Sequence, residues 1–346
     1  MASGRLSGID LVRGYMMCAV TCNHALINMA DQHVHWKMLE AAHHALFATI
    51  GFTTVSGMLV GWFAVAKRER YGRVVARYRT QALRLALIVH PLIAILIAGP
   101  NNSAIWPFMT RSLFITDALA LLFVTVVPFV PRVASRARLA IGLSLALASP
   151  LLAQLSPSND ALRLVQELAC GVDPNQNSLL LSTYGILPMT GFFLVGSWLG
   201  DLLATARDER ELGTWLARRA IWLVALAAAL VTVWTVARRA GFTDLARILY
   251  PDYETTLYPI YLAEAMFVIA IVTRIDPTAP ALRALVTIGK TSLFVYVVQY
   301  AFVQALPYQL GWKGAMQPWA VAALCVVALV VNAVAGKLWN TYVKHA

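Results

Sequence analysis

The sequence predicts an all-α integral membrane protein with about ten transmembrane helices. Hydrophobic residues make up 59% of the 346 residues and charged residues only 13%, which is too apolar for one water-soluble core. Apolar stretches of about 20 residues, the length that crosses a bilayer as a helix, recur along the whole chain. Basic residues collect in alternate connections between these stretches, as they do in proteins that cross a membrane repeatedly.

Four of the first five predicted spans carry a distinguishing feature. The first keeps Arg13 and lacks the small-residue cleavage site of a signal peptide, so we expect it to be retained. The second contains Ser56, the third follows a basic run that ends at Arg84, and the fourth contains Asp117. The five windows are 9–29, 39–66, 82–99, 112–130 and 138–155.

The later five spans include several polar side chains. Glu264 lies in the eighth, Gln299 in the ninth and Asn332 in the tenth, where polar groups usually satisfy one another or have a function. The windows are 180–204, 216–237, 255–274, 286–306 and 318–338. We find no repeat and no Gly/Ser linker, and predict a single domain over residues 1–346.

An even number of spans puts both termini on one side of the membrane. Most of the 28 Lys and Arg residues fall in the segments on that side, which predicts that both termini are cytoplasmic. The net charge of +11 therefore reflects topology and attraction to anionic membrane lipids. No basic groove with interleaved aromatic residues indicates nucleic-acid binding, and the four cysteines show no CxxC spacing.

Two ionisable residues, Arg13 and His24, lie in the first apolar segment, where such groups are costly and usually functional. Eleven residues of α-helix rise about 16 Å and turn about 20° net, so both side chains share one helix face. An extended coenzyme arm is about that long. Arg79 and His90 repeat this spacing on the third span.

The arginine and histidine pattern on the first span resembles that of the membrane acyltransferase-3 family. GIDLVRGYMMCAVTCNH is similar to the opening of that family, FTTVSGMLVG to its Phe-rich SG segment, and IGKTSLFVYVVQY to its late G-x-S-x-x-x-Y helix. RYRTQALRLALIVHP resembles the start of its third span. The combination is also similar to the periplasmic-glucan succinyltransferase branch, and more distantly to the lysosomal heparan glucosaminide acetyltransferase.

This resemblance implies an O-acyltransferase of the bacterial cytoplasmic (inner) membrane. Acetyl-CoA or succinyl-CoA would be a co-substrate from the cytoplasm rather than a permanently bound cofactor, and the acceptor would be a hydroxyl of an extracytoplasmic glycan or lipid-linked glycan. His24 takes the family's catalytic position. The sequence departs from the pattern at Gln299, where the family often has His, and lacks an acidic residue that often precedes the Phe-rich segment.

The chemistry of acyl transfer suggests roles for the remaining residues. A neutral His24 suits removal of a hydroxyl proton at physiological pH. Arg13 would bind coenzyme phosphate, a pantetheine carbonyl or Asp10, or would snorkel to the membrane surface. Arg79 and Arg84 are candidates for the nucleotide phosphates. Ser56, followed by Gly57, would line the thioester path or serve helix packing.

Four further residues are candidates on the acceptor side. Glu264 would orient His24, bind acceptor or make a structural bond to another span. Gln299, His90 and His44 are candidates for binding substrate. No metal site is predicted, because His33, His35, His43 and His44 have no HExxH-like spacing.

Two other classes of protein fit part of the pattern. Glu264, Asp117 and His90 would also suit the polar path of a secondary transporter, although the two halves of the chain show no similarity to each other. A silent scaffold is suggested only by Gln299 at the family's late His position. The sequence gives no indication of oligomeric state.

Overall fold

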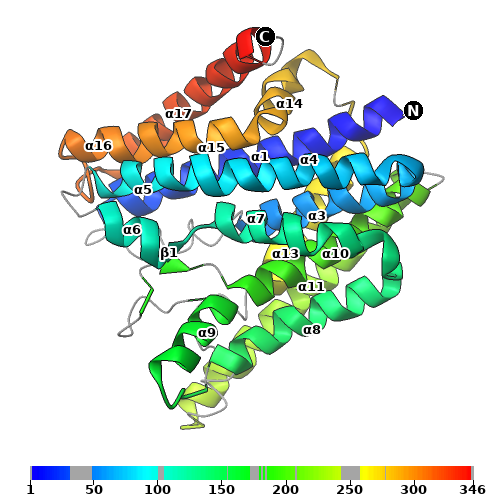
Figure 1. The fold of residues 1–346 in the computed structure, drawn as a ribbon, viewed down its shortest axis with the longest axis horizontal. Coiled ribbons are helices and arrows are strands. Elements are labelled where there is room, and N and C mark those ends of the chain that lie inside the picture. The colour runs from blue at the N-terminus through cyan, green and yellow to red at the C-terminus, as the bar shows by residue number, and fades with distance from the viewer. Residues whose placement is uncertain are drawn as a thin grey trace. The chain divides into compact units, whose positions relative to one another are not determined.

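The computed structural model describes residues 2–31, 49–99, 105–153, 155–171, 179–180, 182–183, 185–206, 209–242, 258–276 and 278–343. This part of the chain is helical, as predicted, apart from two short parallel strands, β1 (Ser112–Leu113) and β2 (Ser182–Thr183) (Figure 1). The α-helices are α1 (Ala2–Met29), α3 (Thr49–Ala66), α4 (Tyr71–Arg84), α5 (His90–Ala98), α6 (Ile105–Arg111), α7 (Ile115–Thr125), α8 (Ser135–Ala153), α9 (Asp160–Cys170), α10 (Ile186–Thr205), α11 (Glu209–Arg239), α13 (Tyr258–Val272), α14 (Arg283–Lys290), α15 (Ser292–Tyr300), α16 (Leu306–Gln309) and α17 (Pro318–Leu338). Short 3₁₀ turns cover Arg68–Arg70, Val127–Arg132 and Pro280–Leu282, and π-helical turns cover Leu85–Val89, Ala301–Ala305 and Trp339–Val343.

Five described helices are long and apolar enough to cross a membrane, and a sixth span results if two bent helices count as one. The bent pair is Pro280–Lys290 with Ser292–Gln309, at an angle of 81°. The five are Arg68–Ala98, Ser135–Ala153, Ile186–Thr205, Arg210–Ala237 and Pro318–Tyr342. These six coincide with six of the ten predicted windows.

The other four windows fall on α1, α3, α7 and α13. In the described residues the last three are apolar helices shorter than a full span, Ile50–Ala66, Ile115–Thr125 and Pro259–Val272. Helix α1 is 28 residues long, but polar residues such as Arg13, Asn23 and His24 lower its hydropathy. Ten spans therefore stay a prediction, as does the side on which the termini lie.

The chain forms two compact units, each assembled from segments far apart in sequence. The first unit comprises Met1–Phe52, Pro91–Phe108 and Ile275–Ala346, and the second comprises Thr53–His90 and Met109–Arg274.

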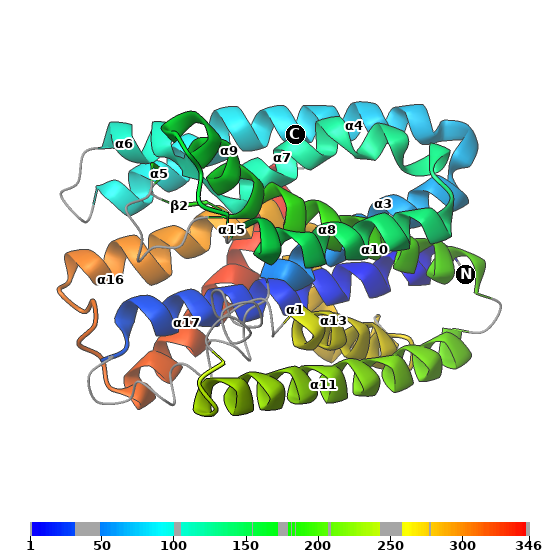
Figure 2. The same ribbon diagram turned by 90° about the horizontal axis from the view of Figure 1, so that it is seen from below.

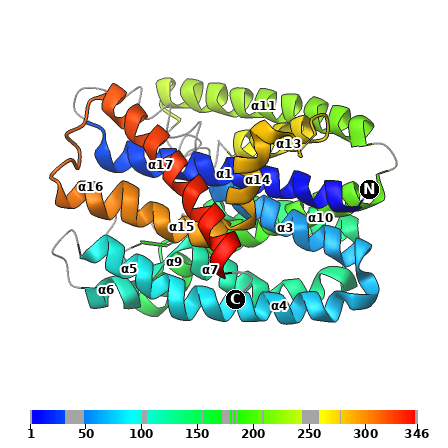
Figure 3. The ribbon, with the colours of Figure 1, turned by 90° about the horizontal axis from the view of Figure 1, so that it is seen from above.

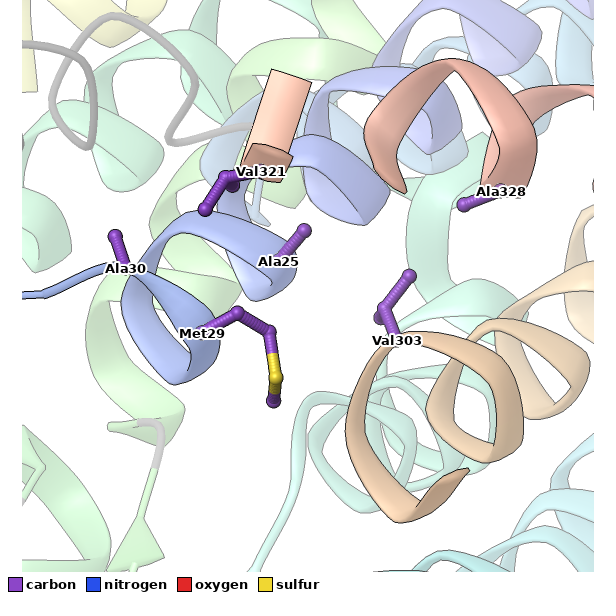
Figure 4. Close-up of a cluster of buried hydrophobic side chains, with 6 residues drawn as sticks. All are labelled: Ala25, Met29, Ala30, Val303, Val321 and Ala328. Carbon is purple, nitrogen blue, oxygen red and sulfur yellow. The ribbon is translucent and has the colours of Figure 1, made fainter. Parts of the chain in front are cut away.

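In the first unit, α1 packs against α14, α15 and α17, and α17 crosses it obliquely (Figure 3). Asn332 of α17 donates a hydrogen bond to Thr21 Oγ1 over 3.0 Å. An apolar cluster joins the end of α1 to α17 and to the π-helical turn that follows α15 (Figure 4); it comprises Ala25, Met29, Ala30, Val303, Val321 and Ala328. This packing holds the last turns of α1 in one place.

In the second unit, α8 packs against α10, α11 against α13, and α4 against α7 (Figure 2). Helices α3 and α10 approach most closely through two glycine pairs four residues apart. A side chain at Gly57 or Gly61 of α3 would collide with the α10 backbone, and one at Gly196 or Gly200 of α10 with the α3 backbone. Small residues at this spacing allow close packing of helix backbones in a membrane.

Two π-helical turns have a common physical cause. A proline ring clashes with the carbonyl group four residues before it and removes one backbone hydrogen bond. Pro91 and Pro307 each follow such a turn, and the carbonyls concerned, Leu87 and Val303, lie within Leu85–Val89 and Ala301–Ala305. The wider turn accommodates the proline without ending the helix.

Candidate active site

Arg13 and His24 both contact the same partner helix, α15. Arg13 Nη2 donates a hydrogen bond to Ser292 Oγ over 2.6 Å, and His24 Nδ1 lies 3.1 Å from Nε2 of Gln299. The two contacts occur in the same order along both helices, so α1 and α15 run parallel here. The predicted shared face of α1 is thus confirmed for this pair, and its counterpart is the face of α15 that carries Ser292 and Gln299.

Two glycines allow α14 to press against α1 next to Arg13. A side chain at Gly14 would collide with the backbone of Leu285, and one at Gly289 with the backbone of Asp10. The helix then breaks at Thr291, and the chain turns to begin α15 at Ser292. With this glycine contact and this break, the Ser292 hydroxyl lies within hydrogen-bonding distance of the guanidinium of Arg13.

Two tyrosine rings of α15 flank the imidazole of His24. The ring centroid of Tyr300 lies 4.9 Å from that of His24, and the centroid of Tyr296 lies 6.5 Å away. The two tyrosine hydroxyls are 3.2 Å apart, within hydrogen-bonding distance. Asn28 Nδ2 donates to the carbonyl oxygen of His24 over 2.8 Å, which steadies the helix turn that carries the imidazole.

Gln299 is fully buried, with 0% of its surface exposed. Its amide nitrogen faces His24, and its Oε1 has no hydrogen-bond partner among the described residues. A buried acceptor without a donor is unfavourable by about 1–3 kcal/mol, so such an atom beside an imidazole is a place where a ligand group would bind.

Arg13 has a buried donor without a protein partner among the described residues. Nη1 lies 3.6 Å from Asp10 Oδ1, and Nη2 is bonded to Ser292. Nε is buried and has no partner among the described residues. Asp10 offsets the positive charge, and the remaining N–H suits a neutral or anionic oxygen of a ligand.

The second unit contains five of the other residues singled out from the sequence, and they lie on four helices. Ser56 is buried on α3, next to Gly57 at the contact with α10. Arg79 and Arg84 are exposed on α4. Glu264 is half-buried on α13 and has interactions within the protein. His44 lies outside the described residues.

His90, the fifth of these residues, is held by protein groups through both ring nitrogens. Nδ1 lies 2.7 Å from Asp117 Oδ2, and Nε2 lies 3.0 Å from the carbonyl oxygen of Met109. The same Asp117 oxygen accepts the backbone N–H of Phe114 over 2.8 Å. Since these partners are acceptors, the ring donates through both nitrogens, and substrate could bind a ring nitrogen only by replacing one of them.

Sequence reasoning missed Ser292, Tyr296 and Tyr300 as site residues. Their spacing with Gln299, at positions i, i+4, i+7 and i+8, is the available signal, because it places all four on one helix face. It also missed a buried ion pair in the second unit, between Arg138 of α8 and Asp201 of α10, to which Ser197 adds a hydrogen bond. In the described residues no three His, Cys, Asp or Glu side chains are arranged to hold a metal ion.

Comparison with known proteins gives one match. The family model of the acyltransferase domain matches residues 6–337, which is nearly the whole chain and includes segments of both units. No curated protein and no solved structure matches.

Proposed function

Because this chain belongs to the acyltransferase-3 family of multi-pass membrane transferases, we propose that it transfers an acetyl or succinyl group from cytoplasmic acyl-CoA to an extracytoplasmic glycan. The acceptor would be a hydroxyl group of a glycan or a lipid-linked glycan. The protein would work in the bacterial inner membrane, as a single domain of ten spans with both termini in the cytoplasm.

One observation carries the proposal: Arg13 and His24, on one helix, contact two points of a second helix that runs parallel to it. A guanidinium with an unpaired N–H suits the coenzyme end of an extended thioester. An imidazole about 16 Å further along suits the reacting carbonyl. The pair therefore fits a donor that enters from one side and an acceptor that arrives from the other.

In the proposed reaction, His24 Nε2 removes the proton of the acceptor hydroxyl while its oxygen attacks the thioester carbonyl carbon. The new C–O bond forms, the C–S bond breaks, and the imidazolium returns the proton to the coenzyme thiolate. Transfer is direct, without a lasting acyl-enzyme. The rings of Tyr296 and Tyr300 flank His24, and their hydroxyls would stabilise the oxyanion.

The remaining candidate residues would bind the coenzyme or the acceptor, or assist His24. Arg79 and Arg84 would bind the coenzyme phosphates, and Ser56 would line the thioester path. Glu264 would help His24 or the acceptor. His90, His44 and Gln299 would contribute on the acceptor side.

The decisive test is mass spectrometry of cell-envelope glycans from cells with and without this chain. We expect a mass difference of one acetyl or succinyl group on one glycan class. A complementing His24→Ala variant should fail to restore that group, whereas the matched control Ile27→Ala, exposed on the same helix, should restore it. Full restoration by His24→Ala would remove His24 from the reaction.

A further inference from the structure

We propose that Gln299 is a positioning residue that sets the tautomer of His24, because its Oε1 accepts a hydrogen bond from Nδ1–H of the imidazole. This inference rests on the proposed role of His24 as the base. Gln299 is suited to the task because its amide is completely buried and contacts only one of the two ring nitrogens, Nδ1.

A neutral imidazole has one N–H donor and one acceptor nitrogen, and a hydrogen bond at one nitrogen decides the state of the other. If the Gln299 amide nitrogen donates to Nδ1, the ring proton must reside on Nε2. Nε2 would then be a donor and unable to remove a proton. If Oε1 instead accepts from Nδ1–H, Nε2 keeps its lone pair and is the base.

A half-turn of the Gln299 amide about its last side-chain bond exchanges the positions of its own oxygen, Oε1, and its own nitrogen, Nε2, without moving the backbone. In the orientation with the amide nitrogen on His24, Oε1 is buried without a hydrogen-bond partner among the described residues. In the other orientation, Oε1 accepts a hydrogen bond from Nδ1–H of His24 at the same 3.1 Å separation. The NH₂ group then points to the position of the unpaired oxygen, where it can donate to the carbonyl oxygen of a bound thioester.

The other titratable groups that face His24 from α15 are Tyr296 and Tyr300. Their hydroxyls are within hydrogen-bonding distance of each other, and their rings lie against the imidazole. The amide of Gln299 lies within hydrogen-bonding distance of a ring nitrogen of His24. An amide at this position fixes the tautomer without adding a charge to the helix contact.

Nitrogen-15 NMR of histidine-labelled protein in detergent tests the tautomer directly. The His24 signals are identified by their loss in His24→Ala. We expect protonated Nδ1 and unprotonated Nε2 at neutral pH, and a mixture of tautomers in Gln299→Met. A wild-type signal from the Nε2–H tautomer would overturn the inference. This measurement needs no turnover, so it stands even if the proposed acyl transfer is wrong.

Kinetics provide a second readout, with acetyl-CoA or succinyl-CoA as donor and release of the coenzyme thiol as the signal. We expect Gln299→Met to lower kcat by at least about tenfold, since it loses part of the contribution of a general base. Gln299→Glu keeps the acceptor oxygen and adds a negative charge, so it should retain activity and move the acidic limb of the pH profile to higher pH. Gln309→Met, an exposed residue of α16, is the matched control and should leave rate and profile unchanged. An equal loss of kcat in Gln299→Glu and Gln299→Met, with no shift of the pH profile in Gln299→Glu, would contradict the inference.

Discussion

Arg13 differs from the other arginines considered for coenzyme binding: it is half-buried, it is bonded to a second helix, and its buried Nε has no partner among the described residues. A lysine has a single ammonium group and cannot contact Ser292 and a ligand oxygen with the geometry of a guanidinium fork. The shape of this side chain, in addition to its charge, is therefore expected to matter for binding.

We predict that Arg13→Lys raises KM for acyl-CoA about tenfold, the effect of losing one charge-assisted hydrogen bond of about 1.5 kcal/mol. Initial rates of thiol release over a range of acyl-CoA concentrations measure the change. Arg136→Lys, at an exposed position of α8, is the control and should keep the wild-type KM. An unchanged KM in Arg13→Lys would show that Arg13 is not a coenzyme ligand.

The buried pair of Arg138 and Asp201 gives a second prediction. Asp201→Asn removes the negative partner and leaves the Arg138 charge buried, which should lower the free energy of unfolding by about 3–5 kcal/mol. Thermal unfolding in detergent measures this loss. Asp276→Asn, at an exposed loop position, should change little. Equal melting temperatures for the two variants would mean that water or lipid compensates the charge.

Among the elements, α14 and α15 show what the sequence could and could not predict. Hydropathy predicted one span over 286–306, and the structure has a helix that ends at Lys290, an 81° bend and a new helix. A sliding average cannot detect the bend, because Thr291 and Ser292 are compatible with a continuous helix. Next to the bend, Gly289 contacts the backbone of Asp10, a contact between segments distant in sequence that no local average includes.

We predict that Gly289→Ala destabilises the protein and impairs the site. The added methyl group collides with the Asp10 backbone and pushes α14 away from α1, at roughly 1–3 kcal/mol. Ser292 should move away from Arg13 at the same time, so activity should fall with the melting temperature. Gly72→Ala is the control, because its new methyl group meets nothing within 4 Å on α4. It should be neutral or stabilising by up to about 1 kcal/mol. A Gly289→Ala protein that keeps the melting temperature and the activity of the Gly72→Ala control would contradict the assigned contact.

At the scale of the site as a whole, the sequence predicted the face of α1 and only one residue of its partner face. The face of α1 with Arg13 and His24 follows from helical geometry alone. On α15 the sequence singled out Gln299 and missed Ser292, Tyr296 and Tyr300, because their helical spacing does not tell which other helix that face contacts. Glu264 stands out in the sequence because an ionisable side chain is energetically costly within a membrane. The same cost applies to residues that only stabilise a helix contact, so it does not identify a site residue.

For the whole molecule, the basic segments predict orientation in the membrane. Glu69 and Lys313 are both exposed, and the ten-span topology puts them on opposite sides. In a background without the four native cysteines, Glu69→Cys should react with an impermeant maleimide only after the cells are permeabilised. Lys313→Cys should react in intact cells. Labelling of both from the outside would disprove the predicted topology.

The two halves of the candidate site are separated by 275 to 279 positions in sequence. At about 5–20 residues per second, a ribosome needs roughly 15–55 s to add that length after α1 has been made. During this interval the first helix carries its guanidinium and imidazole without their final partners. A chain whose translation stops before α15 therefore lacks Ser292 and Gln299, the side chains that contact Arg13 and His24.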